Sequence, residues 1–354
     1  MRRMFKILIA IVLVPLLYVV VNILIAVLTK YKPEPVEDLE VDKSVVVSKQ
    51  VSNENEELKF LIWNIGYGGL GADVDFFYDD GKMVITPESL VRKYINGIYA
   101  TIEEFKDYDF ILLQEVDVNS KRSHGINIAD GILSFLPDHH SIFAKNYDVK
   151  FLPFPWTEPM GKIQSGLLSC SKLEPEEALR IAFPGITDFP RKLFYLERCV
   201  IFSRYNLENG KDLIVINTHL EAYDDGGIKR QQMQVMKEWV TKEYEMGNYV
   251  VIGGDWNIAP PDFDVHKWEK EKIEDKLYLM NNDPDYIQGW KYAYDGNTPT
   301  NRKNNHPFND QTFTTVIDYF LLSPNIELIE VKGVDVGFEN SDHNPVAMRV
   351  KLIR

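Results

Sequence analysis

The chain has 354 residues, of which 45% are hydrophobic and 12% aromatic, enough apolar material for one large domain or two modest ones. Its formal net charge of −14 argues against a protein that holds nucleic acid mainly through its phosphates. Two cysteines exclude a disulfide framework; Cys170 and Cys199 could form one bridge in an oxidising compartment or remain buried thiols.

The N-terminus combines a cationic stub, residues 1–6, with an uncharged apolar segment, residues 7–28. About 20 apolar residues are needed to cross a bilayer, so we expect a transmembrane helix or signal anchor there. The basic stub should stay cytoplasmic, which places the rest of the chain outside. A cleaved signal peptide is the alternative, although the segment is long and no clear small-x-small cleavage site follows it.

Residues 29–57 change in character, because prolines, charges and polar side chains dominate them. Such a composition is typical of a polar tether that holds the next domain off a membrane surface. The valines at 45–47 leave room for one short strand within it. The remaining chain, 58–354, is expected to form the main domain.

Short apolar runs alternate with helical patterns in this domain. A helix is expected from Thr86 as N-cap and Pro87 as first residue, and a second from about Gly227 to Met246. Many strands with few helices favour two stacked sheets with helices outside over a doubly wound parallel sheet. The expected strands are 58–65, 109–116, 165–173, 198–205, 212–220, 249–257, 316–323 and 344–353.

Two stretches, 145–165 and 183–197, are rich in aromatic residues and proline. Neither shows a clear helical or strand period. We therefore expect both to be surface loops that build a rim rather than core elements.

Polar side chains recur where the predicted strands end. Each alone has an ordinary explanation, such as a solvated acid, a turn asparagine or a buried structural histidine. Their recurrence predicts one shared pocket, because ionisable groups are rarely placed within apolar runs without partners. The residues are Asn64, Glu115, Asn217, His219, Asp255, Asn257, Asp318, Asp342 and His343.

Six motifs, "WNI", "LLQEV", "NTHL", "GGDWN", "IDYFLLS" and "SDHNPV", follow one another in this order. The set resembles the signature of the endonuclease/exonuclease/phosphatase superfamily, which includes deoxyribonuclease-I-like nucleases, neutral sphingomyelinases and inositol polyphosphate phosphatases. The resemblance covers nearly all of 58–354. It implies a membrane-anchored, bacterial-type member: a four-layer α/β sandwich of two packed, mainly antiparallel sheets flanked by helices, whose catalytic domain is 58–354.

The resemblance also implies metal-dependent cleavage of a phosphate ester. Matched residue by residue, it gives Glu115, Asn64 and Asp342 as metal ligands, the last partly through water. Hard oxygen ligands of this kind suit Mg²⁺, with Mn²⁺ as an alternative.

Catalytic roles follow from the same match. Asp255 would orient or deprotonate the attacking water, and Asn257 would hold a phosphate oxygen. His343 would touch the scissile phosphate, while Asp318 fixes its tautomer and favours its protonated form. His219 resembles the histidine that related nucleases and sphingomyelinases use near the leaving group.

Other residues carry weaker expectations. Glu158 and Glu197 are candidate acidic partners of His219, which the sequence leaves unassigned. Arg122, Arg198 and Arg302 are candidates for contact with the substrate; solvated charged loops explain such cations equally well.

Three functions are compatible with these observations. The first is a membrane-tethered, extracytoplasmic Mg²⁺-dependent hydrolase of a small or lipid phosphoester, favoured by the acidic composition and the anchor. The second is an anchored or secreted deoxyribonuclease-like endonuclease, and the third a non-catalytic binding module on the same scaffold. A long basic groove would favour nucleic acid, whereas a closed pocket would favour a small ester. The oligomeric state stays open.

Overall fold

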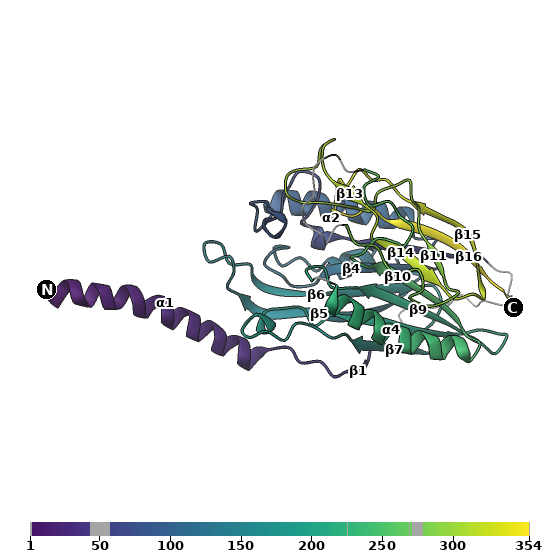
Figure 1. Cartoon of the computed structure of the whole chain (residues 1–354), viewed down its shortest axis with the longest axis horizontal. Helices are drawn as coiled ribbons and strands as arrows, with labels where there is room; N and C mark the ends of the chain where they lie inside the picture. The colour runs from purple at the N-terminus through teal and green to yellow at the C-terminus, as the bar shows by residue number, and fades with distance from the viewer. Residues whose placement is uncertain (1, 43–56, 225, 269, 271–278, 354) are drawn as a thin grey trace.

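The computed structural model describes residues 2–42, 57–224, 226–268, 270 and 279–353 (Figure 1). Two large sheets form its centre, and four α-helices accompany them in the described ranges: α1 (Arg2–Thr29), α2 (Glu88–Glu104), α3 (Ile128–Leu133) and α4 (Gly227–Glu245). Short 3-10 turns occur at η1 (Gly66–Gly68), η2 (Phe77–Asp79) and η3 (Arg191–Leu193).

Sheet A has the strand order β1-β7-β8-β9-β10-β14-β11. All neighbouring strands are antiparallel except β9 and β10, which run parallel. Its strands are β1 (Val36–Asp38), β7 (Glu177–Ala182), β8 (Cys199–Asn206), β9 (Asp212–His219), β10 (Tyr249–Asp255), β14 (Asp318–Leu322) and β11 (Lys291–Ala293).

Sheet B has the order β15-β16-β3-β4-β6-β5-β2, again antiparallel except for the central pair β3 and β4. A separate two-stranded ribbon pairs β12 (Asn301–Arg302) with β13 (Thr314–Thr315). The strands of sheet B are β15 (Ile326–Gly333), β16 (Val346–Leu352), β3 (Glu57–Asn64), β4 (Phe110–Asp117), β6 (Gly161–Ser171), β5 (His140–Leu152) and β2 (Val41–Asp42).

The central strands are buried on both faces, which explains their continuous apolar runs. Successive side chains of β3 point to opposite faces, so Phe60 and Ile62 join the core between the sheets, whereas Leu61 and Trp63 pack toward α2 and α3. In sheet A, Val251 of β10 belongs to the core between the sheets, while neighbouring residues of β9 and β10 pack against α4. The layers are therefore helix, sheet B, sheet A, helix: the predicted four-layer α/β sandwich.

The two predicted helices are present, with one correction at the start of α2. Pro87, not Thr86, precedes the first helical residue, Glu88. The Thr86 hydroxyl instead donates a hydrogen bond to the carbonyl of Gly69 (2.7 Å), and so ties the helix start to the loop after β3.

All eight predicted strands occur, but three substantial ones, β5, β7 and β15, were not predicted. The expectation of a loop over 145–165 was wrong for most of that stretch, because β5 runs to Leu152 and β6 begins at Gly161. Residues 153–160 remain the loop between them. The second predicted rim loop, 183–197, lies between β7 and β8 and contains only the short turn η3.

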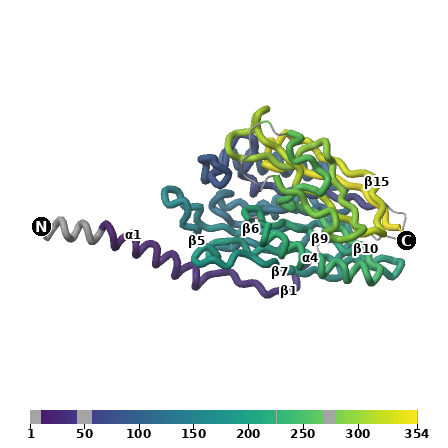
Figure 2. Tube along the Cα trace, viewed as in Figure 1, coloured from purple at the N-terminus to yellow at the C-terminus, as the bar shows by residue number. Residues whose placement is uncertain are grey.

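Helix α1 projects from one end of the domain (Figure 2). Its segment Ile11–Thr29 has a mean hydropathy of 3.0 and is long and apolar enough to cross a membrane. Most of its described side chains are exposed in the isolated chain. These are properties of a membrane span or of a signal sequence.

The chain after α1 differs from the free tether that its composition predicts. Residues 36–38 form β1 at the edge of sheet A, and residues 41–42 form β2 at the edge of sheet B. Leu39 and Val41 pack between the sheets against a buried cluster that includes Ile142 and Cys199. Apolar residues among the charges thus attach this segment to the domain, while the predicted strand at 45–47 lies outside the described residues.

Cys170 and Cys199 are free and buried, each in a different apolar cluster. Burial raises the pKa of the Cys170 thiol to about 12 and, as the largest cause, that of Cys199 to about 11. Of the two alternatives, the structure shows buried thiols rather than a bridge.

Candidate active site

The two parallel strand pairs place their carboxyl ends at one edge of the sandwich. In sheet A, His219 at the end of β9 lies opposite Asp255 at the end of β10, and Asp255 lies opposite Asp318 of β14. In sheet B, Asn64 at the end of β3 pairs with Gln114 of β4, one residue before Glu115. The strand register thus brings together side chains that are far apart in sequence.

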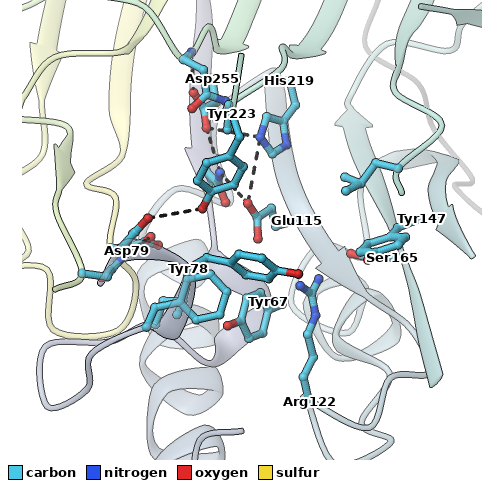
Figure 3. Close-up of a pocket in the computed structure, with 18 of the residues that line it drawn as sticks. Tyr67, Tyr78, Asp79, Glu115, Arg122, Tyr147, Ser165, His219, Tyr223 and Asp255 are labelled. Atoms are coloured by element: carbon cyan, nitrogen blue, oxygen red, sulfur yellow. Dashed lines mark hydrogen bonds and ion pairs between the residues drawn. The ribbon is translucent and has the colours of Figure 1, made fainter. Parts of the chain in front are cut away.

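Glu115 sits at an irregularity in β4. The pairing with β6 shifts between Leu113 and Val116, and Glu115 has a left-handed backbone, with φ of 55°. A non-glycine residue rarely adopts this conformation, and such irregularities often redirect a side chain near a functional site. Here the carboxylate turns into a cavity beside His219 (Figure 3).

Asn64 connects the acids of the two sheets. Its Nδ2 donates to Asp255 Oδ2 (2.9 Å) and approaches Glu115 Oε1 (3.4 Å). Its Oδ1 accepts the backbone N–H of Gly66 (3.0 Å). The carboxamide is therefore fixed in orientation between two carboxylates.

The turn that carries Asp342 and His343 is held against the end of β3. The Ser341 hydroxyl donates to the carbonyl of Asn64 (2.8 Å), and the Trp63 indole donates to the carbonyl of His343 (2.8 Å). Gly66, with φ of 49°, allows a close approach, since a Cβ there would lie 2.7 Å from Asp342 Oδ1. This contact explains how the turn reaches the same cavity as Glu115.

His343 forms an ion pair with Asp318, with its Nδ1 2.8 Å from Asp318 Oδ2. Burial opposes charging of the imidazole, but Asp318 and Asp255 outweigh it and raise the pKa of His343 to about 10. A doubly protonated ring donates through both nitrogens. The carboxamide of Asn301, 3.0 Å from Nε2, can then present its oxygen, which otherwise has no partner among the described residues.

His219 faces the acids through Nε2, which lies 3.5 Å from Asp255 Oδ2 and 4.0 Å from Glu115 Oε1. Burial, followed by the charges of Arg198 and His343, lowers its pKa well below the usual value, so the ring is neutral. Its buried Nδ1 has no hydrogen-bond partner in the part of the chain that the structure describes.

The two candidate acidic partners of His219 do not reach it. Glu197 instead pairs with Lys30 (2.7 Å), and Glu158 is exposed in the loop between β5 and β6. Sequence could not exclude them, because proximity here depends on how that loop and the end of α1 pack.

The donor set at this edge fits a hard divalent cation. Asn64, Glu115 and Asp342 line one cavity and offer amide and carboxylate oxygens. Burial raises the pKa of Glu115, and the charge of Asp342 raises it further, although Arg122 opposes both. A cation bound between these acids would stabilise their charged forms.

A second group, Asp255, Asp318 and His343, also has ligand atoms within 4.8 Å of one another. His343 and Asp318 already satisfy each other there, and a protonated imidazole repels a cation. This group is therefore a less suitable cation site than the oxygen donors of Asn64, Glu115 and Asp342.

The three predicted arginines all line the cavity, but each has partners. Arg122 pairs with Asp117 (2.9 Å) and stacks on the ring of Tyr67, 3.7 Å from its centroid. Arg198 pairs with Glu221 (3.3 Å) and donates to the carbonyl of His219.

Arg302 is buried, and its Nη2 donates to the carbonyls of Leu70, Gly71 and Val74 at 2.9–3.3 Å. These contacts fix the loop after η1. Arg302 thus supports this loop and also lines the cavity, so its contact with substrate stays a prediction.

The other predicted polar residues divide between site and scaffold. Asn257, with φ of 49°, lines the cavity, accepts a hydrogen bond from Lys229 on its carbonyl and donates through Nδ2 to the carbonyl of Leu220 (2.9 Å). Asn217 lies deeper, where it accepts from Gln114 (2.8 Å) and donates to Ser169 (3.2 Å). It therefore joins the sheets rather than facing the cavity.

Sequence reasoning missed several cavity residues on loops. Asn304 donates to Asp342 Oδ2 (2.7 Å) and to Asp79 Oδ2 (3.2 Å), while the Tyr223 hydroxyl bonds Asp79 Oδ1 (3.3 Å) across the opening (Figure 3). Asn301 begins the short strand β12 and Asn304 follows it, within a polar stretch whose composition does not mark them as site residues. The cavity that these residues close has a volume of about 660 Å³.

A family model described as "Endonuclease/Exonuclease/phosphatase family" matches residues 61–343. This chain belongs to the endonuclease/exonuclease/phosphatase family. The match includes every residue of the strand-end cluster. A search of curated proteins finds no match.

Solved structures of this family share the fold. An endonuclease/exonuclease/phosphatase from Beutenbergia cavernae DSM 12333 has a TM-score of 0.54 at 16% identity, over 84% of this chain and 72% of that one. ANGEL2, a 2′,3′-cyclic phosphatase, has a TM-score of 0.53 at 14% sequence identity, over 88% of this chain and 99% of that one. D. rerio TDP2 complexed with single-strand DNA product has a TM-score of 0.51 at 13% sequence identity, over 84% of this chain and 100% of that one.

The endonuclease/exonuclease/phosphatase family includes phosphatases and nucleases, and divalent metals are general in it. Membership therefore supports a hydrolase of phosphoesters. At these identities the structural likeness shows the fold alone.

Proposed function

We propose that this chain is a Mg²⁺-dependent hydrolase of a small or lipid phosphoester, held at a membrane by α1 with its catalytic domain outside the cytoplasm. The observation that carries the proposal is the convergence of Asn64, Glu115, His219, Asp255 and His343 on one cavity. These residues come from four strands and one turn. Hydrophobic packing does not require polar side chains from such distant segments to meet, so their convergence indicates a shared chemical role.

The side chains divide the chemistry among them. The carboxylate of Asp255, fixed by Asn64 and by the backbone N–H of Asn257 (2.9 Å), is placed to orient or deprotonate a water. Protonated His343 supplies positive charge that attracts a phosphate oxygen. The Nδ2 of Asn257 carries two N–H bonds, and one of them donates to the carbonyl of Leu220. The other can donate to a second phosphate oxygen.

Neutral His219 faces the same acids from the other side of the cavity. Because its pKa is lowered, the ring is neutral. A neutral imidazole can accept a proton at one nitrogen, or donate the N–H of the other nitrogen to the leaving oxygen.

Glu115, Asn64 and Asp342 would hold the metal. A bound Mg²⁺, or Mn²⁺ in its place, would neutralise phosphate charge and polarise the ester. Oxygen donors without a thiol favour these ions over zinc.

Membrane attachment rests on α1. The basic residues precede the apolar span, so the positive-inside rule places the catalytic domain on the far side of the membrane. The last turn of α1, with Ile25 and Ala26, lies against Val149 and Leu193 of the domain, which supports an anchor that is retained rather than removed.

The test is hydrolysis by the full chain in lipid nanodiscs, with and without Mg²⁺ or Mn²⁺. Substrates are bis-p-nitrophenyl phosphate, inositol phosphates, sphingomyelin, plasmid DNA and RNA. We expect metal-dependent release from a small or lipid ester. Faster cleavage of DNA than of every small ester would favour the nuclease alternative, and no turnover of any substrate would contradict the proposal.

A further inference from the structure

We infer that the substrate is an amphiphile whose hydrocarbon portion occupies the apolar end of the cavity, while its phosphoester meets the strand-end cluster. This inference rests on the proposed function and specifies its substrate class. The ligand is thus a membrane lipid phosphoester rather than a water-soluble one.

The cavity has two chemically different ends. The polar end consists of the strand-end residues described above. The other end is lined by Leu152, Phe154, Met160, Phe194 and Leu196, which come from β5, the loop after it and the stretch before β8. Leu152 and Met160 belong to an apolar cluster that Phe194 and Leu196 also contact.

Tyr67, Tyr78 and Tyr147 also line the cavity, with Tyr67 and Tyr78 close to Glu115 and Arg122 (Figure 3). The ring of Tyr78 reaches Phe154 (6.3 Å) on one side and Tyr223 (6.0 Å) on the other, so aromatic rings form a continuous wall. A hydrocarbon chain would cover the apolar faces of these rings.

The apolar end lies next to the membrane anchor. Phe194 lines both the cavity and a narrow crevice beneath the last turns of α1, where Ile25 and Ala26 face Val149 and Leu193. Lys30, just after the helix, pairs with Glu197 and donates to the carbonyl of Lys192 (2.8 Å). The segment that forms the apolar end is therefore the segment on which the helix is fixed.

Exposed aromatic residues border the same region. Trp156 is 59% exposed and Phe189 63% exposed, on the loops after β5 and before β8. The ring of Trp156 lies 5.9 Å from that of Tyr18, which is within the apolar span of α1. At a rise of about 1.5 Å per residue, Tyr18 lies roughly 16 Å before Thr29, so this contact places Trp156 beside the apolar span itself.

The volume of the cavity and the free energy gained by moving hydrocarbon into it both suit this ligand. A volume of about 660 Å³ is within the range of sites that bury most of a ligand. Each methylene moved from water to an apolar site contributes about 0.8 kcal/mol, or about fourfold in kcat/KM. Chain length is therefore the variable that tests the inference.

The experiment uses the full chain in nanodiscs with Mg²⁺ and a series of p-nitrophenyl alkyl phosphates, from methyl to dodecyl. Release of p-nitrophenolate reports cleavage of its bond to phosphorus. We expect kcat/KM to rise about fourfold per methylene and then level off when the apolar end is full. Leu196→Trp, which takes up space there, should move this plateau to shorter chains, and Leu196→Gln should flatten the slope.

Partition of long chains into nanodisc lipid would raise rates in every variant alike, so the position of the plateau is the decisive readout. Met246→Gln, on an exposed apolar residue after α4, is the matched control and should keep the wild-type series. Thermal melting confirms that each variant is folded. An active enzyme with a flat series, or a plateau that Leu196→Trp leaves in place, overturns the inference.

A binding measurement tests the assignment of the apolar end separately from the catalytic proposal. Alkylphosphonates of the same lengths, which cannot release the alcohol, are titrated calorimetrically into the same nanodisc samples. If no ester is hydrolysed but affinity rises with chain length and falls in Leu196→Trp, the catalytic proposal fails and the cavity assignment stands. If affinity is independent of chain length, the assignment fails whatever the activity.

Discussion

Two histidines in the cluster at the strand ends have opposite protonation states. His343 is held protonated by Asp318, whereas His219, also buried but close to Arg198 and His343, is held neutral. Two imidazoles with pKa values moved in opposite directions can act as a fixed cation and as a proton acceptor in the same cavity.

The fixed cation gives the first prediction. His343→Ala should lower kcat on bis-p-nitrophenyl phosphate by about 10²–10⁴-fold, since it removes the positive charge that would stabilise the phosphate. Steady-state kinetics measure the loss, and circular dichroism checks the fold. His266→Ala, on an exposed residue, serves as the control. Activity of the His343 variant equal to that of the parent would remove the residue from the mechanism.

The second prediction concerns the metal. EDTA should abolish activity, and Mg²⁺ should restore it. Glu115→Gln keeps the shape of the side chain but loses its charge, so the Mg²⁺ concentration for half-maximal rate should rise by at least about tenfold. Titration of activity with Mg²⁺ gives this value. Glu176→Gln, an exposed acid outside the cavity, should keep the parent value; an equal shift in both variants would argue against Glu115 as a ligand.

At the scale of the elements, buried amides fix the two sheets relative to each other. Asn217 of β9 donates to the carbonyls of Leu113 (3.2 Å) and Leu168 (3.1 Å) in sheet B, and Gln114 donates to its oxygen. Because β4 and β9 carry Glu115 and His219 a step further along, this network sets the distance between the two halves of the site.

The third prediction follows from that network. Asn217→Ala leaves the Gln114 amide and two carbonyls without their partner, so the free energy of unfolding should fall by about 1–3 kcal/mol. Urea denaturation measures the change. Asn206→Ala, at the exposed end of β8 in the same sheet, should change it by less than about 0.5 kcal/mol. A neutral Asn217 variant would mean that water replaces these contacts.

Sequence patterns revealed the elements that are buried on both faces and concealed the others. β3, β4, β9 and β10 appear as unbroken apolar runs because helices cover one face and the opposite sheet the other. β5 is interrupted by Lys145, Asn146 and Asp148, and β15 is an edge strand with charges on its exposed face, so neither shows a clear period.

The site was accessible to sequence reasoning for a related reason. An Asp or His that ends a buried apolar run is visible in the sequence, whereas Asn301 and Asn304 stand among other polar residues in and after the short strand β12. The apolar end of the cavity depends on β5, a loop and the stretch before β8 packing together, which no local pattern records.

At the scale of the whole molecule, α1 projects from the domain and is held to it only near its C-terminal end, through Ile25, Ala26 and the following Lys30 (Figure 1). We predict that the full chain stays with membranes after an alkaline carbonate wash and keeps its unprocessed mass, because a retained apolar span inserts in the bilayer core. Fractionation followed by mass spectrometry of the intact protein tests this. Release into the supernatant at a mass reduced by the first 28 or so residues would favour a signal peptide.

The strands β1 and β2 have a practical consequence for any soluble form of this enzyme. Residues 36–42 cover the otherwise open borders of β7 and β5 and close the gap between the sheets with Leu39 and Val41. A recombinant ectodomain beginning at residue 58 would expose backbone N–H and C=O groups on both borders, and should self-associate in light scattering. One beginning at residue 30 should remain monodisperse under the same conditions, because β1 and β2 still pair with β7 and β5.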